Sequence, residues 1–196
     1  MAIYLIRHAE SVGNVNGRTS SHSSIELTEA GHEQAQKLAT QLPFADHVYI
    51  SSFLRTKQTA QPILERDQLD PEIFAIEEFS YLSDLRCQNT TLEERKPWVD
   101  AYWKDLDVDY MDGNDAESFR AFYQRVQSFR QHLLEIQSKF IEKNLMVFSH
   151  GQFLKLFKML NEQDRVLSAS LMSDFRYEMI NHPIQNTEFF ILDLRS

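Results

Sequence analysis

The chain has 196 residues, enough for one domain with a sizeable core. Hydrophobic residues make up 42% of it and charged residues 25%, an ordinary globular composition that argues against disorder. The formal net charge of −9 disfavours nucleic acid and anionic membranes as partners, because both bind accumulated positive charge. No segment approaches the ~20 apolar residues of a membrane span.

The first half of the chain predicts three strands and two helices. In order they are a strand at 2–7, a helix at 27–42, a strand at 47–51, a helix at 53–66 and a strand at 72–79. Thr28 is the expected N-cap of the first helix, and a polar loop rich in Ser, Gly and Asn precedes it. Because a strand-like segment begins almost at the N-terminus, we expect no signal peptide.

The second half begins with a segment, residues 80–114, that has no clean period and carries both tryptophans. We interpret it as an insertion, or lid, with short helices. A long amphipathic helix is predicted at 117–140, because apolar residues recur there every three or four positions: Phe119, Phe122, Val126, Phe129 and Leu133. The remaining predictions are a strand at 144–150, a helix at 151–161, and closing strands at 175–180 and 187–194 around a turn at Pro183.

Alternating strands and helices predict an α/β fold. We expect three layers, α/β/α, with a mostly parallel sheet that includes one antiparallel strand. Residues 1–196 then form a single domain, with the insertion at 80–114 over the C-terminal ends of the strands. The single cysteine, Cys87, cannot form an internal disulfide, which favours the cytoplasm.

Polar side chains follow each of the first four predicted strands, where ligands bind in open α/β sheets. They are Arg7 and His8, then Ser51, Ser52 and Arg55, then Glu77 and Glu78, and finally Ser149 and His150, which Gly151 follows. Two guanidiniums match the oxygens of a phosphate, and a neutral histidine can attack phosphorus. A second histidine and a helix N-terminus can stabilise the anion, and a carboxylic acid can protonate the leaving alkoxide.

Five segments, in order, resemble the motifs of the histidine phosphatase superfamily, which includes cofactor-dependent phosphoglycerate mutases and many small phosphatases. They read LIRHAESVGNVNG, ELTEAGHEQA, SSFLRTKQTA, GNDAESFRAFYQRV and VFSHGQFLK. The resemblance implies a phosphomonoester hydrolase that acts on a small phosphorylated substrate through a phosphohistidine, with no cofactor. Phosphoglycerate mutase-type transfer and a non-catalytic phosphoester-binding module are the alternatives.

The resemblance also implies roles for individual residues. His8 would be the nucleophile, Arg7, Arg55 and His150 the phosphate pocket, and Asn14 a further phosphate contact. The helix that begins at Gly151 would point its N-terminus at the same anion. Glu78 is the expected proton donor, with Glu77 as its rival. Three positions depart from the family pattern: Ala9 and Gln152 replace glycines, and Leu82 stands where the glycine of E-x-x-x-G is usual.

Other phosphate chemistries lack their motifs. A cysteine phosphatase needs an arginine six residues after its cysteine, where this chain has Glu93, and no P-loop is present. The other histidines, at 22, 32, 47, 132 and 182, are scattered, so we expect no metal site. The aromatic and basic residues of the insertion either pack it against the domain or line the leaving-group side: Arg86, Arg95, Lys96, Trp98, Tyr102 and Trp103. An exposed sheet edge would allow two copies of the chain to pair as a homodimer.

Overall fold

A computed structural model describes residues 2–137 and 142–192, and its centre is a five-stranded sheet. The strands lie in the order β3-β2-β4-β1-β5. Their bounds are β1 (Ala2–Arg7), β2 (His47–Ile50), β3 (Glu72–Ile73), β4 (Asn144–Ser149) and β5 (Phe189–Leu192). All neighbouring strands pair in parallel except β5, which is antiparallel to β1. The predicted sheet, with its one antiparallel strand, is confirmed.

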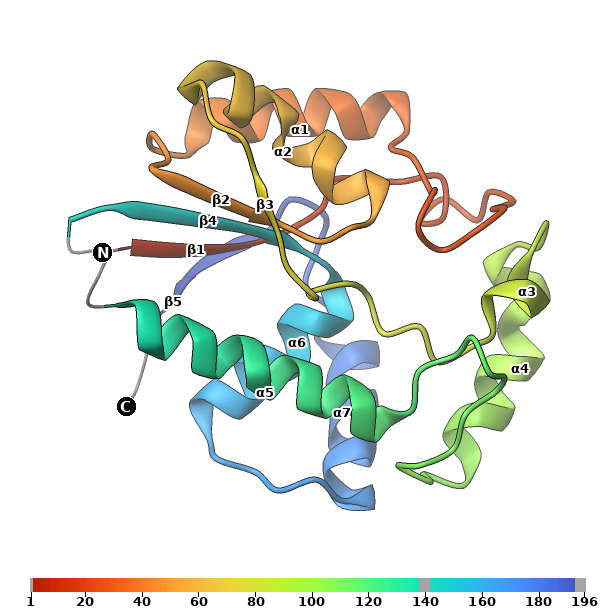
Figure 1. Cartoon of the computed structure of the whole chain (residues 1–196). Coiled ribbons are helices and arrows are strands. Elements are labelled where there is room, and N and C mark those ends of the chain that lie inside the picture. Colours follow the sequence, from red (N-terminus) through yellow and green to blue (C-terminus); the bar gives the residue numbers. More distant parts are fainter. Residues whose placement is uncertain (1, 138–141, 193–196) are drawn as a thin grey trace.

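Helices cover both faces of this sheet (Figure 1). On one face lie α1 (Glu29–Gln41) and α2 (Leu54–Asp67), and on the other α5 (Phe119–Ile136), α6 (Gly151–Glu162) and α7 (Ala169–Asn181). The segment 80–114 contains α3 (Asp84–Cys87) and α4 (Leu92–Lys104), which lie beyond the carboxyl ends of the parallel strands. The three-layer α/β/α architecture is therefore confirmed, and the described part of the chain has no helix that is long and apolar enough to cross a membrane.

Both faces of the sheet are buried, so the middle residues of its central strands are mostly apolar. In β1, Leu5 packs into the core under α5, α6 and α7, while the next residue, Ile6, packs into the core under α1 and α2. In β4, Val147 and Phe148 divide between the same two cores. Successive side chains of a strand point to opposite faces, and here each face meets a helical layer.

The helix predictions agree with the structure at their N-terminal ends. The Thr28 hydroxyl caps α1 by accepting a hydrogen bond from the Gly31 amide at 3.0 Å. Ser118 caps α5, and the predicted apolar stripe of that helix is buried. The end of the prediction, residues 138–140, lies outside the described residues, as do residues 193–194 of the last predicted strand.

The predicted strand at 175–180 is wrong, because these residues lie in α7. Apolar and polar residues alternate there, which resembles a strand, but Tyr177 is 60% exposed and belongs to no buried face. The helix starts earlier, where the Ser168 hydroxyl accepts a hydrogen bond from the Leu171 amide at 3.1 Å. Leu171 and Phe175 are buried one helical turn apart, so the apolar period is that of a helix.

The third predicted strand, at 72–79, is much shorter than expected. Only Glu72–Ile73 pairs with β2. Since β2 ends at Ile50 and Ser51 leads into α2, the remaining residues have no strand beside them. This part of the chain instead runs irregularly past the ends of β2 and β4, and it carries Glu78 to the site described next.

Candidate active site

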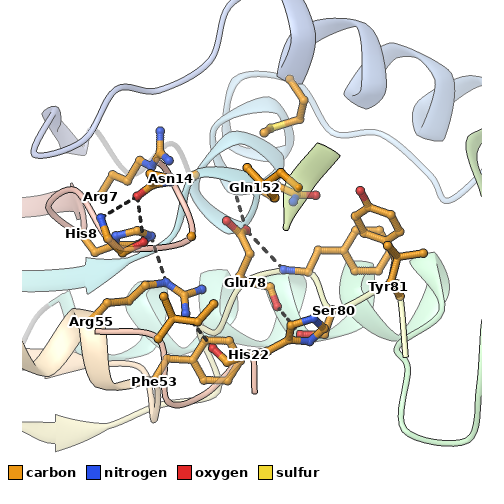
Figure 2. A pocket seen from close by; sticks show the side chains of 18 of the residues that line it. Arg7, His8, Asn14, His22, Phe53, Arg55, Glu78, Ser80, Tyr81 and Gln152 are labelled. Atoms are coloured by element: carbon orange, nitrogen blue, oxygen red, sulfur yellow. Dashed lines mark hydrogen bonds between the residues drawn. The ribbon is translucent and has the colours of Figure 1, made fainter. Parts of the chain in front are cut away.

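A cavity of about 340 Å³ opens at the carboxyl ends of β1, β2 and β4. Six of the predicted site residues line it: Arg7, His8, Asn14, Arg55, Glu78 and Gly151. His150 lies directly behind them, with its ring centroid 5.1 Å from that of His8. The structure therefore brings together residues from four separate segments of the chain. Figure 2 labels Arg7, His8, Asn14, Arg55 and Glu78 among them.

The imidazole of His8 is held with one nitrogen available for attack. Its Nδ1 lies 2.7 Å from the carbonyl oxygen of Ala9, so Nδ1 carries the proton and donates it there. Nε2 then holds a lone pair, and it accepts a hydrogen bond from Nε of Arg55 at 3.1 Å. Burial lowers the pKa of His8 well below 6.5, and the charges of Arg55 and Arg7 lower it further. His8 is therefore neutral at pH 7, as a nucleophile must be.

The two arginines provide the positive charge of the site. Arg55 donates from Nη1 to the carbonyl oxygen of His22 at 2.8 Å, and burial lowers its pKa to about 10. Arg7 donates from Nη1 to the carbonyl oxygen of Ile184, while its Nε is buried without a partner. Two guanidiniums that line one cavity favour an anion between them, because each charge is otherwise incompletely compensated.

Gly151 begins α6 directly against Arg7. A Cβ atom at this position would lie 3.3 Å from Nε of Arg7, tighter than almost all real Cβ contacts. The glycine therefore lets the guanidinium lie across the first turn of the helix, and the positive end of the helix dipole there also favours an anion.

His150 is the second imidazole of the site. Its Nε2 lies 2.7 Å from the hydroxyl of Ser51, while its Nδ1 is buried without a partner. The hydroxyl of Ser51 also accepts a hydrogen bond from the Phe53 amide at 3.2 Å, and it lies 2.9 Å from the hydroxyl of Thr56. Where Ser51 gives its proton to Nε2, the histidine proton lies on Nδ1, which is then a donor. Burial and the charge of Arg55 lower the pKa of His150 well below 6.5.

The two neighbouring glutamates point in different directions. Glu78 lines the cavity, and its Oε1 accepts from the Gln152 amide at 2.9 Å (Figure 2). Burial raises its pKa, although Arg55 and Arg7 act in the opposite sense. Glu77 instead accepts from the amide and hydroxyl of Ser52 and lies outside this cavity. Of the two, Glu78 has the position and the raised pKa of an acid.

The departures from the family motifs fit the structure without displacing the site. Ala9 is fully buried, and its amide donates to the hydroxyl of Thr59 at 3.0 Å. Gln152 supplies its backbone amide to Glu78, a bond that needs no particular side chain. Leu82 is buried in the cavity wall and makes that part of it apolar.

Asn14 and Ser11 lie at the edge of the cavity. Oδ1 of Asn14 accepts hydrogen bonds at 3.0 Å from both the amide and the hydroxyl of Ser11. These contacts fix which side of the amide group is acceptor, so its NH₂ is the end available as a donor.

Two further residues support the site and were not predicted. The carbonyl group of His22 holds Arg55, and the His22 amide donates to Asp84 of α3 at 2.7 Å. Arg125 of α5 donates to the carbonyl oxygens of Ala75 and Glu77, just before Glu78. His22 lies in a polar loop without a motif, and Arg125 resembles any polar residue of an amphipathic helix. The sequence therefore does not mark either residue as part of the site.

The aromatic residues of the insertion serve mainly in packing. Trp103 and Tyr102 are buried in the core that also holds Phe79. Trp98 packs against the same core and lies under the guanidinium of Arg86. Neither tryptophan lines the cavity, nor does Tyr102, whereas Phe79, Tyr81 and Arg95 do. Among residues 2–137 and 142–192, no three His, Cys, Asp or Glu side chains are grouped so as to hold a metal ion.

Comparisons with known proteins show the family of the chain. The sequence model of the Histidine phosphatase superfamily (branch 1) matches residues 3–168. An adenosylcobalamin/alpha-ribazole phosphatase of Escherichia coli K12 is 32% identical over 160 residues, which cover 80% of this chain and 76% of that protein. Phosphoserine phosphatase 1 of Hydrogenobacter thermophilus is 30% identical over 76% of this chain and 70% of its own. The crystal structure of the alpha-ribazole phosphatase of Shigella flexneri superposes with a TM-score of 0.71 at 25% identity, over 100% of this chain and 92% of that one.

Proposed function

Since the chain belongs to the histidine phosphatase superfamily, we propose that it hydrolyses small phosphomonoesters through a phosphohistidine on His8. The family and its named phosphatase relatives support a hydrolase that needs no metal ion. The observation that carries the assignment to His8 is the direction of Nε2, which faces Arg55 within the cavity.

In the first step, Nε2 of His8 attacks phosphorus. A P–N bond forms while the P–O bond to the leaving alcohol breaks, and the carboxyl group of Glu78 gives its proton to the leaving oxygen. Arg7, Arg55 and Nδ1 of His150 donate to the phosphoryl oxygens, where the negative charge of the transition state is spread. The buried Nε of Arg7 and Nδ1 of His150, both without partners, support this role.

In the second step, water attacks the phosphohistidine. The carboxylate of Glu78 takes a proton from the water, the P–N bond breaks, and inorganic phosphate and neutral His8 are released. Asn14 and the N-terminus of α6 at Gly151 contact the phosphate in both steps. Each group thus returns to its starting protonation state.

Hydrolysis is favoured over mutase-type transfer and over a purely binding role. The relatives that cover most of this chain at 30% identity or more carry phosphatase names. The residues proposed as nucleophile, as phosphate donors and as acid lie in or directly beside one cavity, which supports hydrolysis. The two relatives act on different substrates by name, so alpha-ribazole phosphate and phosphoserine are both candidates to be assayed.

The organisation of the chain is part of the proposal. Residues 1–196 form one catalytic domain, in which 80–114 acts as a lid over the cavity. The single cysteine supports residence in the cytoplasm. Pairing of two copies through a sheet edge is a prediction that light scattering would test.

The test is hydrolysis of p-nitrophenyl phosphate in buffer that contains EDTA. We expect turnover by the natural protein and none above background by His8→Ala. Turnover that survives the substitution would remove His8 from the role of nucleophile.

A further inference from the structure

Arg95 of α4 is a buried cation in the wall of the same cavity. It is 7% exposed, and it lines the cavity together with Arg7, His8 and Arg55. No ion pair within 4.0 Å joins Arg95 to a carboxylate of the described residues. A buried charge without a counter-charge is costly, and proteins keep such charges where something compensates them.

The neighbours of Arg95 fix its guanidinium but do not use all of it. Nε donates to the hydroxyl of Thr90 at 2.7 Å, and Nη2 donates to the carbonyl oxygens of Cys87 and Thr90 at 2.9 and 3.0 Å. Nη2 also reaches the hydroxyl of Thr19. Nη1 makes no hydrogen bond with any described residue, and the side chain lines the cavity. One edge of the rigidly held guanidinium, at Nη1, therefore remains available to a ligand.

The other basic residues of the insertion differ from Arg95 in this respect. Arg86 forms an ion pair with Asp112 and lies over the ring of Trp98. Lys96 lies 3.7 Å from Asp100 and is mostly exposed. Arg95 is thus distinguished from both by burial, by its place in the cavity wall and by the lack of an acidic partner.

The charges that line the cavity do not balance with a single phosphate group. Among the lining residues, Arg7, Arg55 and Arg95 are cationic, and Glu78 is the one carboxylate. A phosphate dianion matches Arg7 and Arg55, and Glu78 must be protonated to act as an acid. The charge of Arg95 then remains. Leu92 and Val99 lie about one helical turn from Arg95 in α4 and also line the cavity, and apolar groups nearby strengthen an ionic contact.

We propose that Arg95 binds a second anionic group, carried by the leaving group of the substrate. This inference rests on the proposed phosphatase function and narrows it to phosphomonoesters whose alcohol bears a carboxylate or a second phosphate. The leaving group spans an apolar stretch between the two anions. Nη1 of Arg95, with its edge of the guanidinium held open, donates to the second anion.

The experiment compares substrates that differ only in this charge. One series pairs carboxyphenyl with carbamoylphenyl phosphates, substituted at the meta or para position; the two members of a pair have nearly the same shape but differ in charge. A second series pairs ω-carboxyalkyl phosphates of two to five carbons with their amides, which varies the distance between the phosphate and the second anionic group. For at least one pair we expect the natural protein to prefer the carboxylate by about 10- to 100-fold in kcat/KM, mainly through KM. Arg95→Gln should bring this ratio close to one, and Arg95→Lys should retain part of it.

The matched control is Arg86→Gln, in the same insertion but outside the cavity, which should leave the ratio unchanged. The ratio is measured within one protein preparation, so a partly unfolded sample does not alter it. If Arg95→Gln does not fold, the proposal is tested by the ratio of the natural protein and by whether Arg95→Lys lowers that ratio.

The proposal is overturned if no pair shows a preference for the carboxylate or if Arg95→Gln retains it. In those cases Arg95 only holds the loops at Thr19 and Thr90 together. Failure of the proposed function looks different, because p-nitrophenyl phosphate would then be hydrolysed without His8 or not at all. Calorimetric binding of the same ester pairs to the His8→Ala protein tests Arg95 even then, with tighter binding of the carboxylate as the expected result.

Discussion

Replacing Glu78 with glutamine tests its role as the acid with little change in shape. Oε1 of Glu78 accepts hydrogen bonds from the amides of Gln152 and Phe79 at 2.9 and 3.3 Å, and the oxygen of a glutamine can accept both. The substitution therefore removes the transferable proton and preserves the contacts. We expect the effect to depend on how much the leaving group needs that proton.

For alkyl phosphates, whose alkoxides leave poorly, loss of a general acid typically costs about 10²- to 10⁴-fold in rate. At 1.36 kcal/mol for each factor of ten, this corresponds to roughly 3–5 kcal/mol of activation free energy. p-Nitrophenolate leaves without help, so Glu78→Gln should slow p-nitrophenyl phosphate far less. Glu77→Gln is the matched control, because Glu77 binds Ser52 outside the cavity, and it should leave both rates within a few-fold of those of the natural protein.

The pH profile gives a second readout. Burial raises the pKa of Glu78 and lowers that of His8, so the active form has a protonated Glu78 and a neutral His8. For alkyl phosphates, kcat/KM should fall as the pH rises through the pKa of Glu78, and Glu78→Gln should remove this decline. Equal losses on both substrate classes, or an unchanged alkaline limb, would refute the assignment of Glu78 as the acid.

Two further predictions concern stability. Phe122 of α5 is fully buried against Phe79, Phe153 and Phe175, so Phe122→Ala should lower the free energy of unfolding in urea by about 3–5 kcal/mol. Phe44→Ala, at a 68% exposed site, should lower it by about 1 kcal/mol or less, and equal losses would contradict the assignment of the core. Burial lowers the pKa of His8 and His150, so below pH ~6.5 the unfolded chain binds protons that the folded chain does not. The melting temperature should therefore fall between about pH 7 and pH 5, and less so in His8→Gln; an equal fall in both proteins would exclude the contribution of His8.

The fold could be predicted where the apolar pattern was long or strongly periodic. The stripe of α5 and the apolar runs of β1 and β4 belong to this class, because each is buried by regular packing on a whole face. The prediction for residues 175–180 is wrong because six residues are too few to distinguish strand alternation from helical spacing. The helical period becomes visible only with Leu171, a buried residue that lies one turn before Phe175 and outside this segment. The length of β3 was wrong because it depends on where its neighbour ends at Ile50, which is a property of the sheet.

The candidate site could be predicted to the extent that its residues follow strands. His8, Arg55 and His150 converge because parallel strands end at the same edge of the sheet, whatever the intervening sequence. The supporting contacts could not be predicted in this way. His22 holds Arg55 through a backbone carbonyl, and Arg125 reaches backbone carbonyls beside Glu78, so the identity of the contacted residues leaves no pattern in the sequence.

The most direct measurement is to trap the phosphorylated protein during turnover and locate the phosphate. The protein is mixed with a phosphomonoester, quenched in alkali to preserve phosphohistidine, digested and analysed by mass spectrometry. We predict one phosphate on the peptide that contains His8, lost on brief acid treatment and absent from His8→Ala. Phosphate on another residue of a protein that turns over normally would contradict the account.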